Sequence, residues 1–356
     1  MIITVVLSRI LTQNNKTMTR LMVILYALSF SACIGQTSKS SGEESLIRKI
    51  LIDPSPQEIK EVLNELRKQD LSPRGVVIHD SILLSNSNKL FILSHKVEGL
   101  THYGAVIIPA NSNDKKLPIV LFATGGDGMH KEFDISQDFN HPAVQFPSFL
   151  GDKFDNKFII VIPSFRGQQL ILDDKKFQSD GNISDAFGGA TTDALALLNV
   201  TLNTFKQADE SRIVMYGGSR GGTVALLASA RDKRIKRTIA VAAPTDMKAL
   251  YQLYPDQFKL LFFNDLLAGK ISEGEARKKF ISISPIYFVD ELPLVQLHHD
   301  KNDPFVPADF AGKLTDSMKA HGKIIDSYFY DEGIHGFWTD KNYWNRVQEF
   351  IRPLAE

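Results

Sequence analysis

The sequence predicts an α/β fold, in which a mostly parallel β-sheet carries helices on both faces. Short apolar runs alternate with helix-forming segments from residue 117 to the end, and parallel strands require such helical connections. The chain has 356 residues, of which 43% are hydrophobic, and this is enough to bury one large core or two modest ones. Residues 245–280 break the alternation and predict a small inserted helical cap.

The strand candidates are short apolar runs bounded by Gly, Pro or polar residues, and those before residue 117 are expected to be antiparallel. The expected strands are residues 75–84, 90–96, 103–109, 117–123, 158–162, 212–216, 238–243, 292–297 and 324–330. The helix candidates are rich in Ala and Leu or carry apolar residues at helical spacing. The expected helices are residues 54–69, with Ser55 as N-cap, 190–205, 223–230, 308–321 and 343–351.

The cap segment is rich in aromatic residues at helical spacing. They are Tyr251, Tyr254, Phe258, Phe262 and Phe263. Because they stand between two core strands, we interpret them as exposed residues of a cap over the site, in which Phe262 and Phe263 line a substrate pocket. The alternative is two ordinary surface helices whose aromatic rings pack into the core.

Residues 1–33 have the features of an export signal. A basic start at residues 18–20 precedes an apolar run at 21–30, which is too short to span a membrane as a helix. Cys33 then follows a small residue, and this arrangement resembles a bacterial lipoprotein signal. The resemblance implies a lipid on Cys33 and an exported, membrane-anchored protein, periplasmic or at the cell surface. An ordinary cleaved signal peptide is the alternative.

The remaining sequence and the composition limit the expected domain organisation and the expected partners. Residues 34–53 are expected to be a tether, and residues 54–356 a globular domain. Basic and acidic residues number 41 each, so nothing favours nucleic acid or an anionic membrane surface as a partner. Cys33 is the single cysteine, so no intrachain disulfide is expected.

One glycine-rich stretch, residues 217–222, carries the strongest chemical signal. A buried strand precedes it and a helix follows it, so Gly217-x-Ser219-x-Gly221 matches a nucleophile elbow. Gly217 and Gly221 leave room for a sharp turn that exposes the Ser219 hydroxyl. The N–H groups at the start of the following helix point to the same place, where an oxyanion could form.

A serine nucleophile needs a base and an orienting acid, which follow the serine in the order Asp, His in this arrangement. His335 stands between two glycines on the loop after the last strand and is the expected base. Asp300 and Asp303 on the preceding loop are both candidates for the acid. No metal or other cofactor is expected, because the adjacent His298 and His299 point in opposite directions and His-Glu-x-x-His is absent.

These motifs resemble the catalytic domain of the prolyl oligopeptidase family of α/β-hydrolases, from about residue 103 to the end. The matching motifs are the elbow, Ser284-Pro285-Ile286-Tyr287, Asp303-x-x-Val306-Pro307, Gly333-x-His335-Gly336-Phe337 and, more weakly, Pro163-x-x-Arg166-Gly167. The resemblance implies the α/β-hydrolase fold, Ser219 as nucleophile, Asp303 as acid and His335 as base.

The sequence departs from the family's pattern in three places. Thr124-Gly125-Gly126-Asp127 replaces the family's His-Gly-Gly-Pro or tyrosine, so the backbone N–H groups of Arg220 and near Gly126 are the expected oxyanion donors. Asp300 stands where the family usually has glycine after a histidine. No β-propeller precedes the hydrolase segment in this sequence, which favours an esterase over a peptidase.

The sequence therefore predicts a serine hydrolase that cleaves an ester or amide bond through an acyl-enzyme. A small ester or a peptide is the expected substrate, and esterase and peptidase activity both remain open. The alternative function is a non-catalytic surface lipoprotein that uses a hydrolase scaffold to bind a ligand.

Overall fold

The computed structural model describes residues 41–356, apart from 111, 113–114, 127–130, 137–140, 152–153, 155 and 338–339. The chain divides into two units at residue 50. Helix α3 (Ser41–Ile50) belongs to the first unit except for its last residue, and it occupies residues expected to form a tether. The expected signal region, Cys33 included, lies outside the described residues. None of the described helices is both long and apolar enough to cross a membrane.

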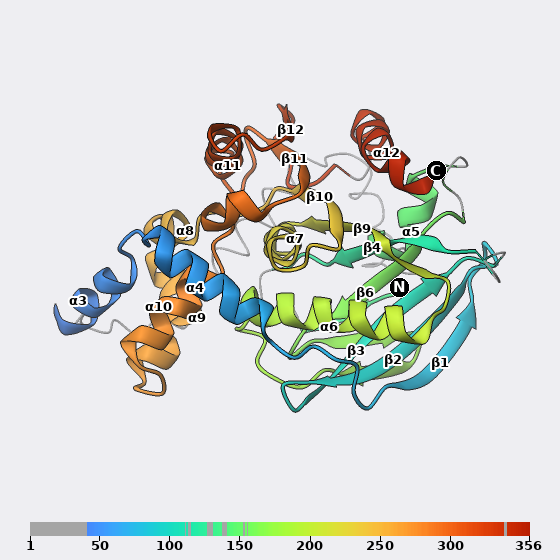
Figure 1. The fold of residues 1–356 in the computed structure, drawn as a ribbon, viewed down its shortest axis with the longest axis horizontal. Helices are drawn as coiled ribbons and strands as arrows, with labels where there is room; N and C mark the ends of the chain where they lie inside the picture. The colour runs from blue at the N-terminus through green and yellow to red at the C-terminus, as the bar shows by residue number, and fades with distance from the viewer. Residues whose placement is uncertain are drawn as a thin grey trace, which may run out of the picture. The chain divides into compact units, whose positions relative to one another are not determined.

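The second unit is built on a nine-stranded sheet with the order β1-β2-β3-β6-β4-β9-β10-β11-β12 (Figure 1). β1, β2 and β3 pair antiparallel, β3 also pairs antiparallel with β6, and the strands from β6 to β12 are parallel to one another. Their bounds are β1 (Val77–Leu83), β2 (Lys89–Val97), β3 (Leu100–Ile108), β4 (Leu117–Ala123), β6 (Ile159–Ser164), β9 (Ala208–Gly218), β10 (Ile235–Val241), β11 (Leu294–Asp300) and β12 (Ile325–Tyr330). All the expected strands are present, so the mostly parallel sheet is confirmed.

The expected helices also form, each within a few residues of its predicted ends. They are α4 (Pro56–Arg67), α6 (Gly188–Thr204), α7 (Arg220–Arg231), α11 (Asp309–Ala320) and α12 (Lys341–Ala355). The Ser55 side chain accepts the Glu58 N–H while the Glu58 carboxylate accepts the Ser55 N–H, so α4 begins with a capping box.

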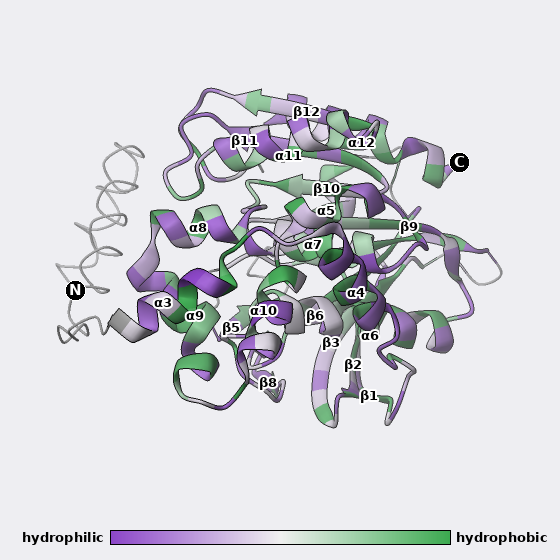
Figure 2. Ribbon diagram, turned by 60° about the vertical axis from the view of Figure 1, so that its left-hand side comes forward, coloured by the Kyte–Doolittle hydropathy of each residue, from purple (hydrophilic) through white to green (hydrophobic). Residues whose placement is uncertain are grey.

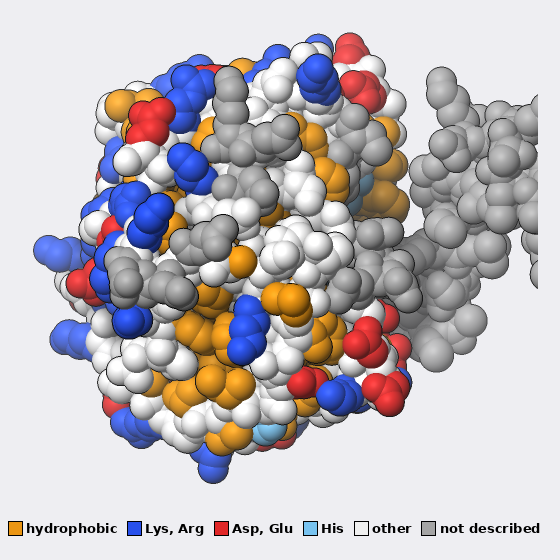
Figure 3. Space-filling model, turned by 90° about the vertical axis from the view of Figure 1, so that its right-hand side faces the viewer, with side chains coloured by type: hydrophobic (Ala, Val, Ile, Leu, Met, Phe, Trp, Pro, Cys, Tyr) orange, Lys and Arg blue, Asp and Glu red, His pale blue; other side chains and the backbone are white. Residues whose placement is uncertain are grey.

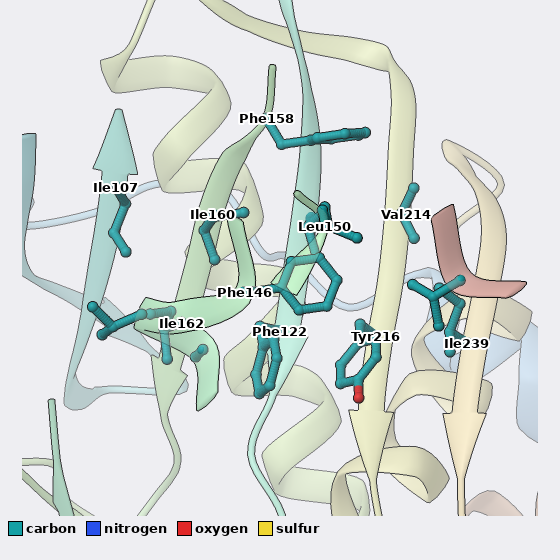
Figure 4. Close-up of a cluster of buried hydrophobic side chains, with 14 of the residues drawn as sticks. Ile107, Phe122, Phe146, Leu150, Phe158, Ile160, Ile162, Val214, Tyr216 and Ile239 are labelled. Atoms are coloured by element: carbon teal, nitrogen blue, oxygen red, sulfur yellow. The ribbon is translucent and has the colours of Figure 1, made fainter. Parts of the chain in front are cut away.

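The two faces of the sheet bury separate hydrophobic clusters. One cluster packs the sheet against α6 and α7, and the other packs it against α12 and α5 (Pro142–Phe149). In the second cluster Phe122, Phe146 and Tyr216 lie together, with the rings of Phe122 and Tyr216 stacked at 4.7 Å between centroids (Figure 4). The Tyr216 hydroxyl also hydrogen-bonds the Tyr343 hydroxyl at 2.6 Å, which fastens α12 to the sheet.

Helix α5 and a second, three-stranded sheet were not predicted. That sheet consists of β5 (Glu132–Asp134), β7 (Gln169–Leu172) and β8 (Lys175–Gln178). Its strands have only three or four residues, too few to show the two-residue periodicity on which strand prediction depends.

The cap segment forms three helices: α8 (Met247–Leu253), α9 (Pro255–Leu267) and α10 (Glu273–Ser282). A 3₁₀ segment, Pro285–Glu291, then leads into β11. In Figure 2 the arrowheads of β10 and β12 point toward the side on which α8 lies. The helices therefore follow the carboxyl end of β10, the edge of the sheet at which Ser219 also stands.

The interpretation of Phe262 and Phe263 as exposed residues is wrong, because both are buried. Phe263 stacks on Phe280 of α10 at 5.6 Å between ring centroids and meets the edge of Tyr251 at 5.2 Å. Phe262 contacts Phe280 and, at the start of α6, Phe187. The rings are therefore the core that holds these helices to one another and to α6.

Figure 3 shows one face of the molecule, where hydrophobic side chains emerge between charged side chains of both signs. This face shows no extended area of a single charge, which agrees with the balanced composition of the chain.

Truncation of Phe263 should destabilise the protein rather than change its substrate preference. Phe263 is fully buried, so Phe263→Ala should lower the free energy of unfolding by about 3–5 kcal/mol. Leu260→Ala on the same helix removes a side chain that is 67% exposed and should change stability by less than about 0.5 kcal/mol. Urea unfolding of both variants measures the difference. A stable Phe263→Ala protein with an altered substrate preference would show instead that the ring lines a pocket.

Candidate active site

Ser219 occupies a sharp turn between β9 and α7. Its backbone angles are φ 54° and ψ −126°, a region that residues with a side chain rarely adopt. The Ser219 N–H donates to the carbonyl oxygen of Val241 at the end of β10, at 2.7 Å. The neighbouring strand thus holds the strained conformation, as is common at functional sites.

Close packing of the backbone around Ser219 leaves room only for glycine at positions 217, 221 and 222. A Cβ at Gly217 would overlap the Gly221 carbonyl, and a Cβ at Gly221 would overlap the Ala123 carbonyl at the end of β4. A Cβ at Gly222 would lie 2.7 Å from the Ala243 Cβ. The proposed role of Gly217 and Gly221 in leaving room for the turn is therefore confirmed.

His335 and Asp303 are joined as an acid–base pair. The Asp303 Oδ2 lies 2.7 Å from the His335 Nδ1, and the Asp303 side chain is fully buried. The Asp303 Oδ1 accepts the N–H groups of Phe305 at 2.8 Å and Val306 at 2.9 Å. An ionised carboxylate accepts only, so the His335 Nδ1 carries the proton and its Nε2 is left as the basic nitrogen.

His299 supports the same loop. Its Nε2 donates to the Val306 carbonyl at 2.8 Å and lies 3.7 Å from the Asp303 Oδ2. Burial lowers the pKa of His299, so the ring stays neutral beside the Asp303 carboxylate.

Ser219, Asp303 and His335 stand at one edge of the sheet, because they follow the parallel strands β9, β11 and β12 at their carboxyl ends. No hydrogen bond joins the Ser219 hydroxyl to His335, both of which the structure describes. Such bonds are often long in unliganded enzymes and tighten when substrate binds.

The loop after β4 lies directly against Ser219. A Cβ at Gly125 would be 3.6 Å from the Ser219 Cβ, and Gly126 has φ +114°, which favours glycine. The Arg220 Nη2 donates to the Gly125 carbonyl at 3.2 Å, and its guanidinium lies 5.1 Å from the centre of the Phe165 ring. The Arg220 side chain therefore ties this loop to α7, a contact that the sequence did not predict. Asp127, the last residue of the motif, lies outside the described residues.

Phe305 is a second residue that sequence reasoning missed. Its ring meets the His335 ring edge-on at 5.2 Å between centroids and is 46% exposed. The sequence could have indicated Phe305, because it stands two residues after Asp303, and Asp303 bonds His335. Phe305 therefore gives His335 an apolar, accessible neighbour.

The weaker motif residue, Arg166, is buried and belongs to an ion-pair network that reaches the surface. Its guanidinium lies 2.8 Å from Asp185, 2.8 Å from Asp193 and 3.0 Å from Glu98. Asp185 and Asp193 come before and within α6, so Arg166 joins α6 to the loop after β6. Among the described residues no cluster of His, Cys, Asp or Glu is arranged to hold a metal ion.

The sheet order, the elbow and the His–Asp pair together describe an α/β-hydrolase with the machinery of a serine hydrolase. A sequence model of the prolyl oligopeptidase family matches residues 153–352, which include Ser219, Asp303 and His335. The chain belongs to the prolyl oligopeptidase family and is a serine hydrolase, an esterase or a serine peptidase. No curated protein matches the chain in sequence.

Solved structures share the fold at low sequence identity. Acetyl xylan esterase 1 from Thermoanaerobacterium is 15% identical, with a TM-score of 0.62 over 87% of this chain and 98% of that one. Acylaminoacyl peptidase from Pyrococcus horikoshii is 16% identical, with a TM-score of 0.54 over 77% of this chain and 49% of that one. Dipeptidyl peptidase 4 from Porphyromonas gingivalis is 15% identical, with a TM-score of 0.54 over 75% and 35%. This chain thus spans about half the length of the acylaminoacyl peptidase and about a third of the length of the dipeptidyl peptidase.

Adding one methyl group should have a large effect at Gly217 and a small effect at Gly218, the two glycines before Ser219. Gly217→Ala should lower both activity and stability, the latter by about 1–3 kcal/mol, because its Cβ overlaps the Gly221 backbone. Gly218→Ala is the matched control, since nothing lies within 4 Å of its Cβ position. Thermal unfolding and the rate of ester hydrolysis test both. A Gly217→Ala enzyme as stable as the control would contradict this account of the elbow.

Proposed function

We propose that the protein hydrolyses small esters, with Ser219 as nucleophile, His335 as general base and Asp303 as the orienting acid. The observation that carries the assignment is the 2.7 Å bond between Asp303 and His335, at the same sheet edge as the strained Ser219 turn. Asp303 fixes the imidazole in the tautomer that leaves the Nε2 basic.

The proposed reaction has two steps. His335 removes the proton from the Ser219 hydroxyl as its oxygen attacks the ester carbonyl, and then gives that proton to the leaving alcohol. Water, activated by the same nitrogen, hydrolyses the acyl-enzyme and releases the carboxylic acid. The backbone N–H groups of Arg220 and near Gly126 would stabilise the oxyanion, each by roughly 3 kcal/mol in comparable sites.

Two considerations support an ester as the substrate. The acetyl xylan esterase is matched over nearly its whole length, whereas the peptidases are matched over half or less. In addition, an alcohol is a better leaving group than an amine, so ester cleavage makes smaller demands on proton transfer. The non-catalytic binding function is not favoured, because ligand binding does not require a bonded acid–base pair beside an elbow serine.

Ser219→Ala should lower kcat by roughly 10⁶-fold, as in a comparable triad, and the variant should still fold. The wild-type enzyme should cleave p-nitrophenyl acetate and butyrate with a higher kcat/KM than aminoacyl p-nitroanilides. A fluorophosphonate probe should label the wild type and spare the variant. Residual turnover near wild type would overturn the role of Ser219. A preference for the anilides would overturn only the ester substrate.

We also propose that the protein is exported and anchored by a lipid on Cys33, on the strength of the single cysteine after a short apolar run. Cys33→Ser should then move the protein from the membrane fraction to the soluble fraction of the expressing cell. Fractionation followed by immunoblotting measures this, with Ser31→Ala as a control that keeps the cysteine. Equal partitioning of the two variants would favour plain secretion.

A further inference from the structure

Asp300 differs from the family pattern and is fully buried at the end of β11. Its register partner is Tyr330, the last residue of β12, so the loops that carry Asp303 and His335 begin side by side. The position of Asp300 places its side chain between these two loops.

The Asp300 carboxylate accepts three backbone N–H groups. Its Oδ1 accepts from Asn302 at 2.8 Å and Gly333 at 3.0 Å, and its Oδ2 accepts from Glu332 at 2.8 Å. Asn302 belongs to the loop that carries Asp303, here called the acid loop. Glu332 and Gly333 belong to the loop that carries His335, here called the base loop. One buried side chain therefore joins the backbones of both loops.

The geometry also rules out Asp300 as the acid. Both of its oxygens are used by backbone N–H groups, and the bond to the His335 Nδ1 is made by Asp303. Gly333 has φ +71°, so the base loop turns sharply at the residue that Asp300 holds, two residues before His335.

We propose that Asp300 is a positioning residue that sets the distance between Asp303 and His335 by tying their loops together. The proposal rests on the function proposed above for these two residues. A glycine at this position has no side chain to accept the three N–H groups, so another member with glycine must hold its base loop by other contacts.

Asp300→Ala should lower kcat by about 10²-fold with little change in KM, because a displacement of about 1 Å in a catalytic group has an effect of that size. The drop should be smaller than that of Asp303→Asn, about 10⁴-fold in a comparable triad. The downfield ¹H NMR signal of the His335 Nδ1 proton should weaken in Asp300→Ala, because the bond to Asp303 loosens.

The matched control is Asp331→Asn. Asp331 also spans the two loops, by accepting the Asn302 Nδ2 at 2.6 Å, but its side chain is 67% exposed. The control removes the same charge and should leave kcat, KM and the downfield signal unchanged.

Asp300→Asn decides the matter if Asp300→Ala does not fold. The amide keeps one accepting oxygen and the size of the side chain, but it turns an N–H donor toward at least one backbone N–H. It should lower kcat and weaken the downfield signal, less than Asp300→Ala does. If Asp300→Asn behaves as Asp331→Asn does, the proposal is wrong.

Ser219→Ala separates this inference from the proposed function. If Ser219→Ala is inactive and the Asp300 variants keep wild-type kcat and the downfield signal, only the role of Asp300 is overturned. If Ser219→Ala remains active, the proposed mechanism itself fails, whatever the Asp300 variants do.

Discussion

The close approach of three backbone segments at Ser219 is the constraint on which the site depends. The ends of β4, β9 and β10 meet there, and the contacts leave no space for a Cβ at Gly217 or Gly221. The bond from the Ser219 N–H to Val241 fixes the turn from one side, and the loop after β4 closes it from the other. The proposed nucleophile and the proposed oxyanion donors thus lie just beyond the carboxyl ends of the neighbouring strands β4 and β9.

The features predicted correctly are those whose cause is local in the sequence. The central strands β4 and β6 are nearly continuous apolar runs, and the elbow is a strand, a glycine-rich turn and a helix within about 20 residues. The cap aromatics were misjudged because helical spacing shows that residues share a face, not what covers that face. Phe262 and Phe263 are covered by Phe187 and Phe280, and no pattern near residue 262 indicates those partners.

Buried polar groups on β11 and β12 support the start of the base loop. The His298 Nδ1 bonds the Tyr330 hydroxyl at 2.8 Å, and its Nε2 lies 3.0 Å from the Gln296 Oε1. Burial lowers the pKa of His298 to about 3, so the ring is neutral and serves as both donor and acceptor. His298 therefore fixes the last residue of β12, immediately before the loop that carries His335. Adjacent histidines on β11 thus support different loops, His298 the base loop and His299 the acid loop.

The choice between Asp300 and Asp303 shows what the sequence leaves open. The two aspartates are three residues apart, at the end of β11 and in the loop after it. Both side chains are fully buried, and either satisfies the order Ser, Asp, His. Their roles differ because of the donors that surround them. The Asp303 Oδ1 accepts two backbone N–H groups, and its Oδ2 is left for the imidazole. In the proposed mechanism its charge therefore stabilises the imidazolium as it forms. Both oxygens of Asp300 accept backbone N–H groups, so its charge fixes the shape of the loops. Which donors surround a carboxylate depends on the register of β11 and β12 and on the path of two loops, and these become known only in three dimensions.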